Sequence, residues 1–354
     1  MDLRKQKMCA GAEKCTDYVL IFSRSSGSPT VHYLVVDHSG RSTRLLPTMS
    51  TTVMWVVENV IGYRVAVLDG FMYVVGGRQI KSGSNVNMCY RYDPRNGQWT
   101  RRASLSEPRT AFSLRALDGR LYVCGGRLRD GGVTAAVECY DPALDQWTEV
   151  RPMPAPRAHH ASCVAMGRLF VSGGVADNRA GTKTFWQYDP ASDFWSQADD
   201  KTSRLPRVRQ RHLMSEYKGT LYSFSGVTVT RIGQRATEVE DEQMTSFDCT
   251  KGNIDTKITG MWDESLPHLP APRGEAGCVV LGHAVYVLGG RRYSDKKDVL
   301  QVDRYSTKAR KWTTCFSLGE TNFADVECCV LRVPASNPHF SSLSRAISHK
   351  WVMW

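Results

Sequence analysis

Short runs of hydrophobic residues, separated by glycine, proline and aspartate, recur along most of the chain. One type of run is rich in β-branched and aromatic residues and ends in two glycines, which is typical of a buried strand beside a close backbone approach. Four copies occur: FMYVVGG ending at Gly77, LYVCGG at Gly126, LFVSGG at Gly174 and VYVLGG at Gly290. A fifth copy, LYSFSG ending at Gly226, has Ser225 in place of the first glycine. The pattern predicts an all-β protein built from an internal repeat.

Two more features keep step with the glycine pair. A Tyr-Asp-Pro unit follows about fifteen residues later in three repeats, and a tryptophan follows each unit, at Trp99, Trp147 and Trp195. These tryptophans are 48 residues apart, and later repeats end at Trp262 and Trp312. A period near 50 residues indicates a propeller in which each repeat forms one four-stranded blade.

The repeat around Gly126 shows the four expected strands. They are residues 111–117, 120–126, 136–141 and 146–150, with a tight turn at Asp118-Gly119 where glycine accepts a positive φ.

The count of repeats predicts how the propeller closes. Five repeats span about residues 55–311. Strand-like runs at 18–24, 30–37 and 42–49 precede them, and one more run, at 324–334, follows. Three strands plus one make a sixth blade built from both ends of the chain, which removes exposed sheet edges. We therefore expect a six-bladed propeller over 16–334, with 324–334 innermost in the shared blade, a linker at 1–15 and a tail at 335–354.

An arginine precedes the first strand of four repeats, at Arg109, Arg157, Arg209 and Arg273. Together with the glycine pair, the Tyr-Asp unit and the tryptophan, this motif resembles the Kelch repeat. The arrangement is most similar to the Kelch-like family of Cullin-3 substrate adaptors. The resemblance implies a six-bladed Kelch β-propeller that binds a protein substrate and is not an enzyme. In that family a BTB domain binds Cullin-3, and only about fifteen residues precede the first strand here. We thus expect contact with Cullin-3 only through a BTB domain that this chain lacks.

The resemblance also implies where a partner binds. In Kelch-like propellers the contacts come from residues after the first-strand arginine, residues after the glycine pair, and the loops between the second and third strands (bc loops). These positions give the candidate residues Arg78, Thr110, Arg127, His159, Gln210, Arg211, Glu275 and Arg291. Because guanidinium groups pair with carboxylates and phosphates, an acidic or phosphorylated peptide is the expected ligand. The alternative is that some of these arginines form structural ion pairs between blades.

Two segments depart from the repeat. From Gly226 to Trp262 is 36 residues, against 21 or 22 in the three repeats before it. The added stretch at 227–246 is either a solvated mobile loop or a loop that touches the partner. For the tail at 335–354 we expect disorder, with packing on the side of the propeller as the alternative.

The distribution of charge bears on the class of partner. The net charge is +11, but the basic residues are scattered and lack interleaved aromatics, which favours a solvated surface over nucleic-acid binding. An acidic actin filament is the alternative protein partner.

No apolar run suits a signal peptide or a membrane span, so we expect a cytoplasmic protein without membrane contact. The eleven cysteines include no Cys-x-x-Cys pair, and several lie in strand-like runs, which predicts buried free thiols.

No motif supports catalysis or metal binding. His159-His160 is the one adjacent histidine pair, and a strand would point the two rings to opposite faces. The chain contains no His-Glu-x-x-His motif, phosphate loop or Ser-His-Asp order. We therefore expect no catalytic residue, no cofactor and no metal. A propeller enzyme is the alternative, because propeller loops can bring distant carboxylates together.

Overall fold

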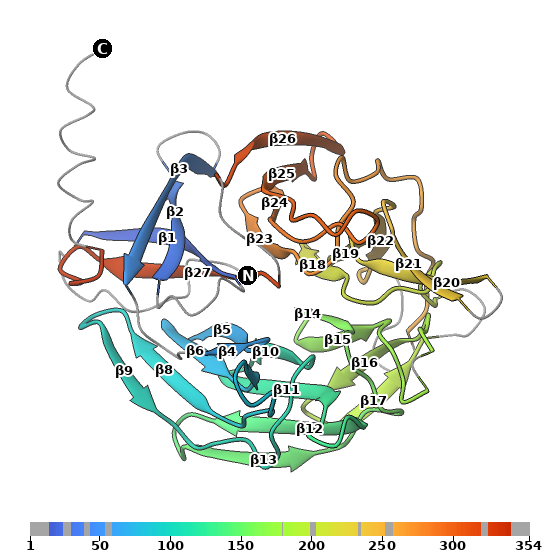
Figure 1. The fold of residues 1–354 in the computed structure, drawn as a ribbon, viewed down its shortest axis with the longest axis horizontal. Helices are drawn as coiled ribbons and strands as arrows, with labels where there is room; N and C mark the ends of the chain where they lie inside the picture. Colours follow the sequence, from blue (N-terminus) through green and yellow to red (C-terminus); the bar gives the residue numbers. More distant parts are fainter. Residues whose placement is uncertain are drawn as a thin grey trace.

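The computed structural model describes residues 14–23, 30–38, 43–53, 59–178, 180–198, 203–232, 235–251, 258–319 and 325–340. These residues form β-strands and turns, and no helix among them is long and apolar enough to cross a membrane. Six sheets stand around a common axis (Figure 1). The expected six-bladed propeller is confirmed.

Five of the six blades are four-stranded. From the axis outward their strands are as follows: first blade β27 (Glu327–Pro334), β1 (Cys15–Phe22), β2 (Thr30–Asp37) and β3 (Arg44–Val53); second blade β5 (Arg64–Leu68), β6 (Phe71–Val75), β8 (Cys89–Asp93) and β9 (Gln98–Arg101); third blade β10 (Ser113–Leu117), β11 (Arg120–Arg127), β12 (Val133–Asp141) and β13 (Gln146–Val150); fourth blade β14 (Ala161–Ala165), β15 (Arg168–Ser172), β16 (Phe185–Asp189) and β17 (Phe194–Gln197); sixth blade β23 (Gly277–Leu281), β24 (Ala284–Leu288), β25 (Gln301–Ser306) and β26 (Lys311–Ser317).

The fifth blade departs from this plan. Its sheet has three strands, β18 (Leu213–Tyr217), β19 (Thr220–Phe224) and β22 (Thr245–Asp248). Where a fourth strand is expected, the described residues show a single bridge between Ser246 and Asp263. The long connection forms a separate hairpin of β20 (Val227–Ile232) and β21 (Arg235–Glu240). A short pair, β4 (Val60–Ile61) with β7 (Arg78–Gln79), extends the second blade.

Both ends of the chain close the ring. β27 pairs antiparallel with β1 over its whole length, from Cys15 opposite Pro334 to Phe22 opposite Glu327. The six inner strands contact one another in a closed cycle, and β27 touches both β5 and β23 (Figure 1). The expectation that 324–334 supplies the innermost strand of the shared blade is therefore confirmed.

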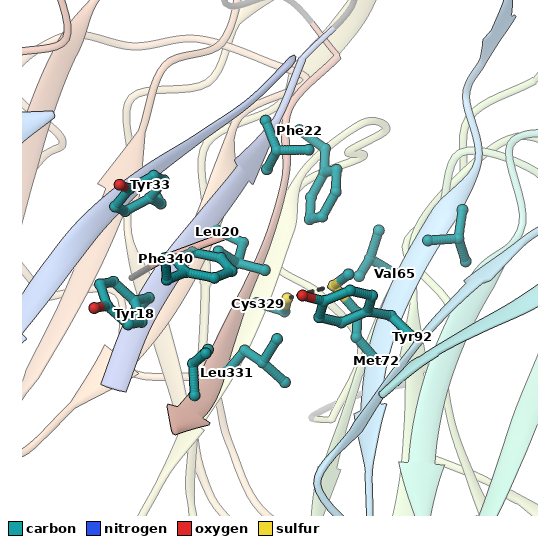
Figure 2. Packing of buried hydrophobic residues seen from close by; sticks show 13 residues of the cluster. Tyr18, Leu20, Phe22, Tyr33, Val65, Met72, Tyr92, Cys329, Leu331 and Phe340 are labelled. Carbon is teal, nitrogen blue, oxygen red and sulfur yellow. Dashed lines mark hydrogen bonds between the residues drawn. The ribbon is translucent and has the colours of Figure 1, made fainter. Parts of the chain in front are cut away.

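The core lies between neighbouring sheets. Tyr18, Leu20 and Leu331 of the first blade pack on Met72 and Tyr92 of the second (Figure 2), and similar clusters fill the other seams. The glycine pairs are needed because a Cβ at Gly125 would lie 2.4 Å from the Arg157 carbonyl oxygen. That same carbonyl accepts a hydrogen bond from the Gly126 N–H at 2.8 Å, which links the third blade to the fourth.

The repeated arginines are buried structural groups. Arg109, Arg209 and Arg273 are at most 1% exposed, and each pairs with a carboxylate of its own blade: Glu138, Asp241 and Asp303 respectively. Arg157 lacks such a partner; it donates to Thr184 Oγ1 at 2.6 Å and lies 4.3 Å over the Trp186 ring. Burial lowers the pKa of Arg157 to about 10.

Cysteines and chain ends differ from expectation in part. Nine cysteines of the described residues are free, and six of these are buried, among them Cys329, which contacts Met72. Cys15, in contrast, is disulfide-bonded, so the expectation of free thiols is wrong for this residue. The first six residues of the expected tail, 335–340, are packed against the propeller, whereas 341–354 lie outside the described residues.

Candidate binding face

Every blade begins with a residue in the left-handed backbone conformation, two positions before its innermost strand. Going round the axis, the φ values are 65° at Gly62, 55° at Ala111, 54° at His159, 53° at Arg211, 54° at Glu275 and 51° at Asp325. Backbone N–H groups join several of them: His159 donates to Ala111 at 2.9 Å, and Arg211 donates to His159 at 2.8 Å. We call these six residues the axial ring. One repeated backbone frame thus carries six different side chains.

The predicted contact residues gather at this end of the axis. His159, Arg211 and Glu275 belong to the axial ring itself. The residue before a ring residue pairs with the residue after a glycine pair through two backbone hydrogen bonds, of 3.1 and 2.7 Å for Thr110 with Arg127. Gln210 pairs in this way with Val227, Gly274 pairs with Arg291, and Ile61 lies opposite Arg78. The ring and the bc loops therefore form one surface, which we call the bc face.

Three of the predicted arginines share one local role. Each stands at or just after the end of the second strand of its blade and donates to a carbonyl of its own bc loop: Arg78 to Gly83 at 2.8 Å, Arg127 to Gly131 at 3.3 Å and Arg291 to Lys296 at 3.2 Å. These hydrogen bonds stay within one blade and brace the loop. They also hold the guanidinium groups on the bc face.

Arg211 has a different environment. Its guanidinium lies 3.2 Å from Glu238 of the inserted hairpin and 3.3 Å from Glu275 of the axial ring. The Tyr293 ring lies 5.3 Å beneath the same group. Two carboxylates therefore match the charge of Arg211, and this arginine contributes little positive potential to the bc face.

The inserted hairpin is docked on this face. Glu238 joins β21 to Arg211, and the Glu240 carboxylate accepts the N–H groups of Tyr293 and Ser294, the latter at 2.7 Å. Tyr293 and Ser294 belong to the bc loop of the sixth blade. These contacts hold the described part of the segment against the bc face, whereas contact with a partner stays a prediction; residues 233–234 lie outside the described residues.

Three charged residues at this end of the axis, Arg64, Asp325 and Glu327, were not predicted from the sequence. Arg64 of β5 lies 3.0 Å from Glu327 of β27 and 3.8 Å from Asp325 of the axial ring. The pair joins the second blade to the first, and burial raises the pKa of Glu327. Neither β5 nor β27 follows a first-strand arginine, so the motif that located the other ring positions was absent. Alignment of the innermost strands would have placed Asp325 in the ring.

The two adjacent histidines precede β14 rather than lying in a strand, and they have different environments. His160 is buried and its Nε2 lies 2.9 Å from Ser113 Oγ, whereas His159 is in the axial ring. Burial lowers the pKa of His159 well below its usual value, and the charges of Arg211, Arg127 and Arg64 act in the same direction. His159 is thus neutral near pH 7 and can donate or accept a hydrogen bond. Within the described residues no three His, Cys, Asp or Glu side chains are grouped to hold a metal ion.

Comparison with known proteins decides the family. The KLHDC2/KLHL20/DRC7 Kelch-repeats domain matches residues 62–251 and 113–332. The chain belongs to the Kelch-repeat family. Kelch-like protein 26 of Danio rerio is 32% identical over 275 residues, which cover 76% of this chain and 42% of that relative. The mouse Kelch-like protein 26 is 49% identical over 77 residues, covering 21% of this chain and 12% of the relative.

A solved structure supports the fold of this Kelch propeller. The structure titled "Structure of YjhT" superposes with a TM-score of 0.66 at 14% identity, covering 83% of this chain and 97% of the other. At that identity the likeness concerns the fold alone. The Kelch propeller spans less than half the length of the curated relatives named above. Membership of this family supports a protein-binding module.

Proposed function

We propose that the bc face of this Kelch propeller binds a segment of a partner protein and serves as the substrate-recognition module of a Cullin-3 ubiquitin ligase adaptor. One observation carries the proposal. The repeated residues of each blade are buried and structural, whereas the axial ring presents a different side chain from every blade on the same backbone frame. Unrepeated chemistry on a rigid repeated scaffold is what a specific binding surface needs.

The charge on this face suggests which part of it meets an acidic segment. The bc loops of the second and third blades carry Arg78, Lys81, Arg127 and Arg129 against one acidic residue, Asp130. The ring residues of these two blades, Gly62 and Ala111, bring no charge. Around the rest of the ring, Glu238 and Glu275 lie beside Arg211, and Asp325 of the first blade lies beside Arg64. We therefore place an acidic or phosphorylated segment over the second and third blades.

Charge reversal tests this placement. The change Arg78→Glu/Arg127→Glu should abolish capture of a partner from cell lysate, because both guanidinium groups lie on the bc face and outside the core. Arg120→Glu/Lys251→Glu is the matched control, since these exposed residues lie in or beside turns at the other end of the blades. The captured protein is identified by mass spectrometry, and its acidic segment is then titrated as a synthetic peptide. Retained capture by a folded Arg78→Glu/Arg127→Glu protein would contradict the proposal.

The role in ubiquitination has a separate test. The described residues form a propeller alone, so we assign substrate capture to them and assign no Cullin-3 contact to their surface. Joined to a Cullin-3-binding domain, the propeller should direct ubiquitin to the captured partner, and the Arg78→Glu/Arg127→Glu variant should not. Ubiquitin transfer that is equal for both proteins would contradict the adaptor role.

A further inference from the structure

In three blades the turn between the third and fourth strands links the blade to the one before it. The last residue of this turn is left-handed in the third, fourth and sixth blades, with φ values of 51° at Asp145, 47° at Asp193 and 50° at Arg310. Asp145 accepts the Ala103 N–H at 3.0 Å, Asp193 accepts the Arg151 N–H at 2.9 Å, and Arg310 reaches Asp263 at 2.9 Å. In each case the partner belongs to the preceding blade.

The same aspartates cap buried tyrosines. The Tyr140 hydroxyl donates to Asp145 at 2.6 Å, and the Tyr188 hydroxyl donates to Asp193 at 2.7 Å. A second link runs across these seams through tryptophan. The indole N–H groups donate to a carbonyl of the preceding blade at 2.8–3.1 Å for Trp147, Trp195, Trp262 and Trp312.

Among the described residues, the second blade shows neither link. Gly97, with φ 71°, occupies the turn position of Asp145 and Asp193 and has no side chain to reach the first blade. Trp99 occupies the position of the seam-crossing tryptophans, but its buried indole nitrogen finds no acceptor among the described residues. Tyr92, fully buried like Tyr140, would be left without the carboxylate that caps its counterpart.

Residues 335–340 cap Tyr92 and link the two blades in place of the missing turn aspartate. Asn337 is fully buried, and its Nδ2 donates to the Tyr92 hydroxyl at 3.0 Å and to the Pro94 carbonyl at 2.5 Å. The His339 ring lies 3.1 Å from the Gly97 carbonyl oxygen. At the other side of the seam, the Phe340 ring packs between Tyr18 and Tyr33 of the first blade, with centroids 4.8 and 5.0 Å away (Figure 2).

The segment is itself shaped for this position. The Asn337 carboxamide oxygen accepts the His339 N–H at 2.8 Å, and the Asn337 carbonyl accepts the Phe340 N–H at 3.2 Å. The Ala335 N–H donates to the Lys14 carbonyl at 2.9 Å, so the segment is anchored where β27 meets β1.

We propose that residues 335–340 form a strap that docks at the seam between the first and second blades, where Asn337 replaces the missing turn aspartate and Gly97 leaves the space that the strap fills. The steric fit supports the second half of this statement. A Cβ at position 97 would lie 2.9 Å from both Pro338 Cγ and His339 Cδ2. The strap and an aspartate at position 97 are therefore mutually exclusive solutions to the same seam.

Because the two solutions exclude each other, the effect of Gly97→Asp on the melting temperature should change sign when the strap is weakened. In the full chain, Asn337→Ala should raise the hydrogen-exchange rate of residues 335–340 and 94–101 about tenfold, because a buried cap is lost. Gly97→Asp should displace the strap and lower the melting temperature. In the Asn337→Ala background, Gly97→Asp should instead raise the melting temperature, because the new carboxylate can cap Tyr92 as Asp145 caps Tyr140.

A matched control locates the effect. Asp145→Ala removes the same cap at the next seam, so it should speed exchange around Ala103 and Tyr140 and leave 335–340 unchanged. His339→Ala, a milder change at the strap, serves if Asn337→Ala does not yield folded protein, and it should speed exchange of 335–340 alone. The proposal is overturned if strap variants leave exchange at 335–340 and 94–101 unchanged, or if Gly97→Asp lowers the melting temperature equally in both backgrounds.

Discussion

The buried pair of Arg273 and Asp303 offers a quantitative check on how the blades are held. Both side chains are fully buried, and the guanidinium lies 2.7 Å from the carboxylate. Asp303 also accepts the Thr314 hydroxyl at 2.7 Å. In Asp303→Asn the guanidinium would stay buried without a counter-charge, which destabilises proteins by about 3–5 kcal/mol.

The fourth blade supplies an independent magnitude. Arg157 stands at the equivalent position without a carboxylate, and burial alone lowers its pKa from 12.5 to about 10. At about 1.4 kcal/mol per pH unit, this lowering corresponds to a penalty of about 3 kcal/mol for the buried charged form. Burial also lowers the pKa of Arg273, and Asp303 opposes that effect. Loss of Asp303 should therefore cost about the penalty that Arg157 carries.

Urea unfolding followed by circular dichroism measures this cost. For Asp303→Asn we expect a loss of about 3 kcal/mol, and the midpoint should fall by about 1 M if the slope is about 3 kcal/mol per M. Asp295→Asn is the control in the same blade, since its pair with Arg292 spans 3.7 Å with both side chains at least 36% exposed, and it should change stability by less than about 1 kcal/mol. The double change Arg273→Met/Asp303→Leu should recover part of the loss. An Asp303→Asn loss no larger than that of Asp295→Asn would refute the argument.

Two further predictions concern the loss of stability at low pH and the strand that closes the propeller. Burial lowers the pKa of His160 to about 3, so the folded state disfavours its protonation; stability is complete above about pH 6.5 and should fall by up to about 1.4 kcal/mol per unit as the pH drops from there towards 3. Urea midpoints at pH 7.5, 6 and 5 should fall in that order. Because burial also lowers the pKa values of His159 and His212, His160→Gln should make the dependence shallower without removing it; an equally steep dependence in the variant would exclude a contribution from His160. Deletion of residues 324–354 removes the innermost strand of the first blade and should abolish soluble folding, which an unchanged melting curve would contradict.

The sequence predicts the blades because each repeated residue has a structural role within its own blade or at its seam. The glycine pairs, the buried arginines and the tryptophans stand where backbones approach or sheets meet, so their period alone indicates the fold. Counting strands also predicts the shared first blade. The contacts of the axial ring were harder to predict, because Arg211 meets Glu238 only through the hairpin, and Arg64 meets Glu327 only after the ring has closed.

The contact between Asn337 and Tyr92 was the hardest to predict. Asn337 is 245 residues from Tyr92, and nothing around it resembles the repeat. A signal was nevertheless present at the other partner, since the turns DPALD and DPASD of the third and fourth repeats become DPRNG in the second. The missing aspartate at Gly97 marks a seam that needs a partner, although only the folded chain shows which segment supplies it.

The structure separates the residues that hold the propeller from those that give it specificity. Arg109 and Arg273 are fully buried, and their carboxylate partners lie in the same blade, so a change there acts on stability. Arg78 has the same charge but is exposed and braces only its own loop. Because the guanidinium of Arg78 meets water, its reversal should leave the melting temperature within a few degrees while changing the charge that a partner meets. Binding and folding can therefore vary independently on this frame, which explains how one repeated blade can present an unrepeated surface.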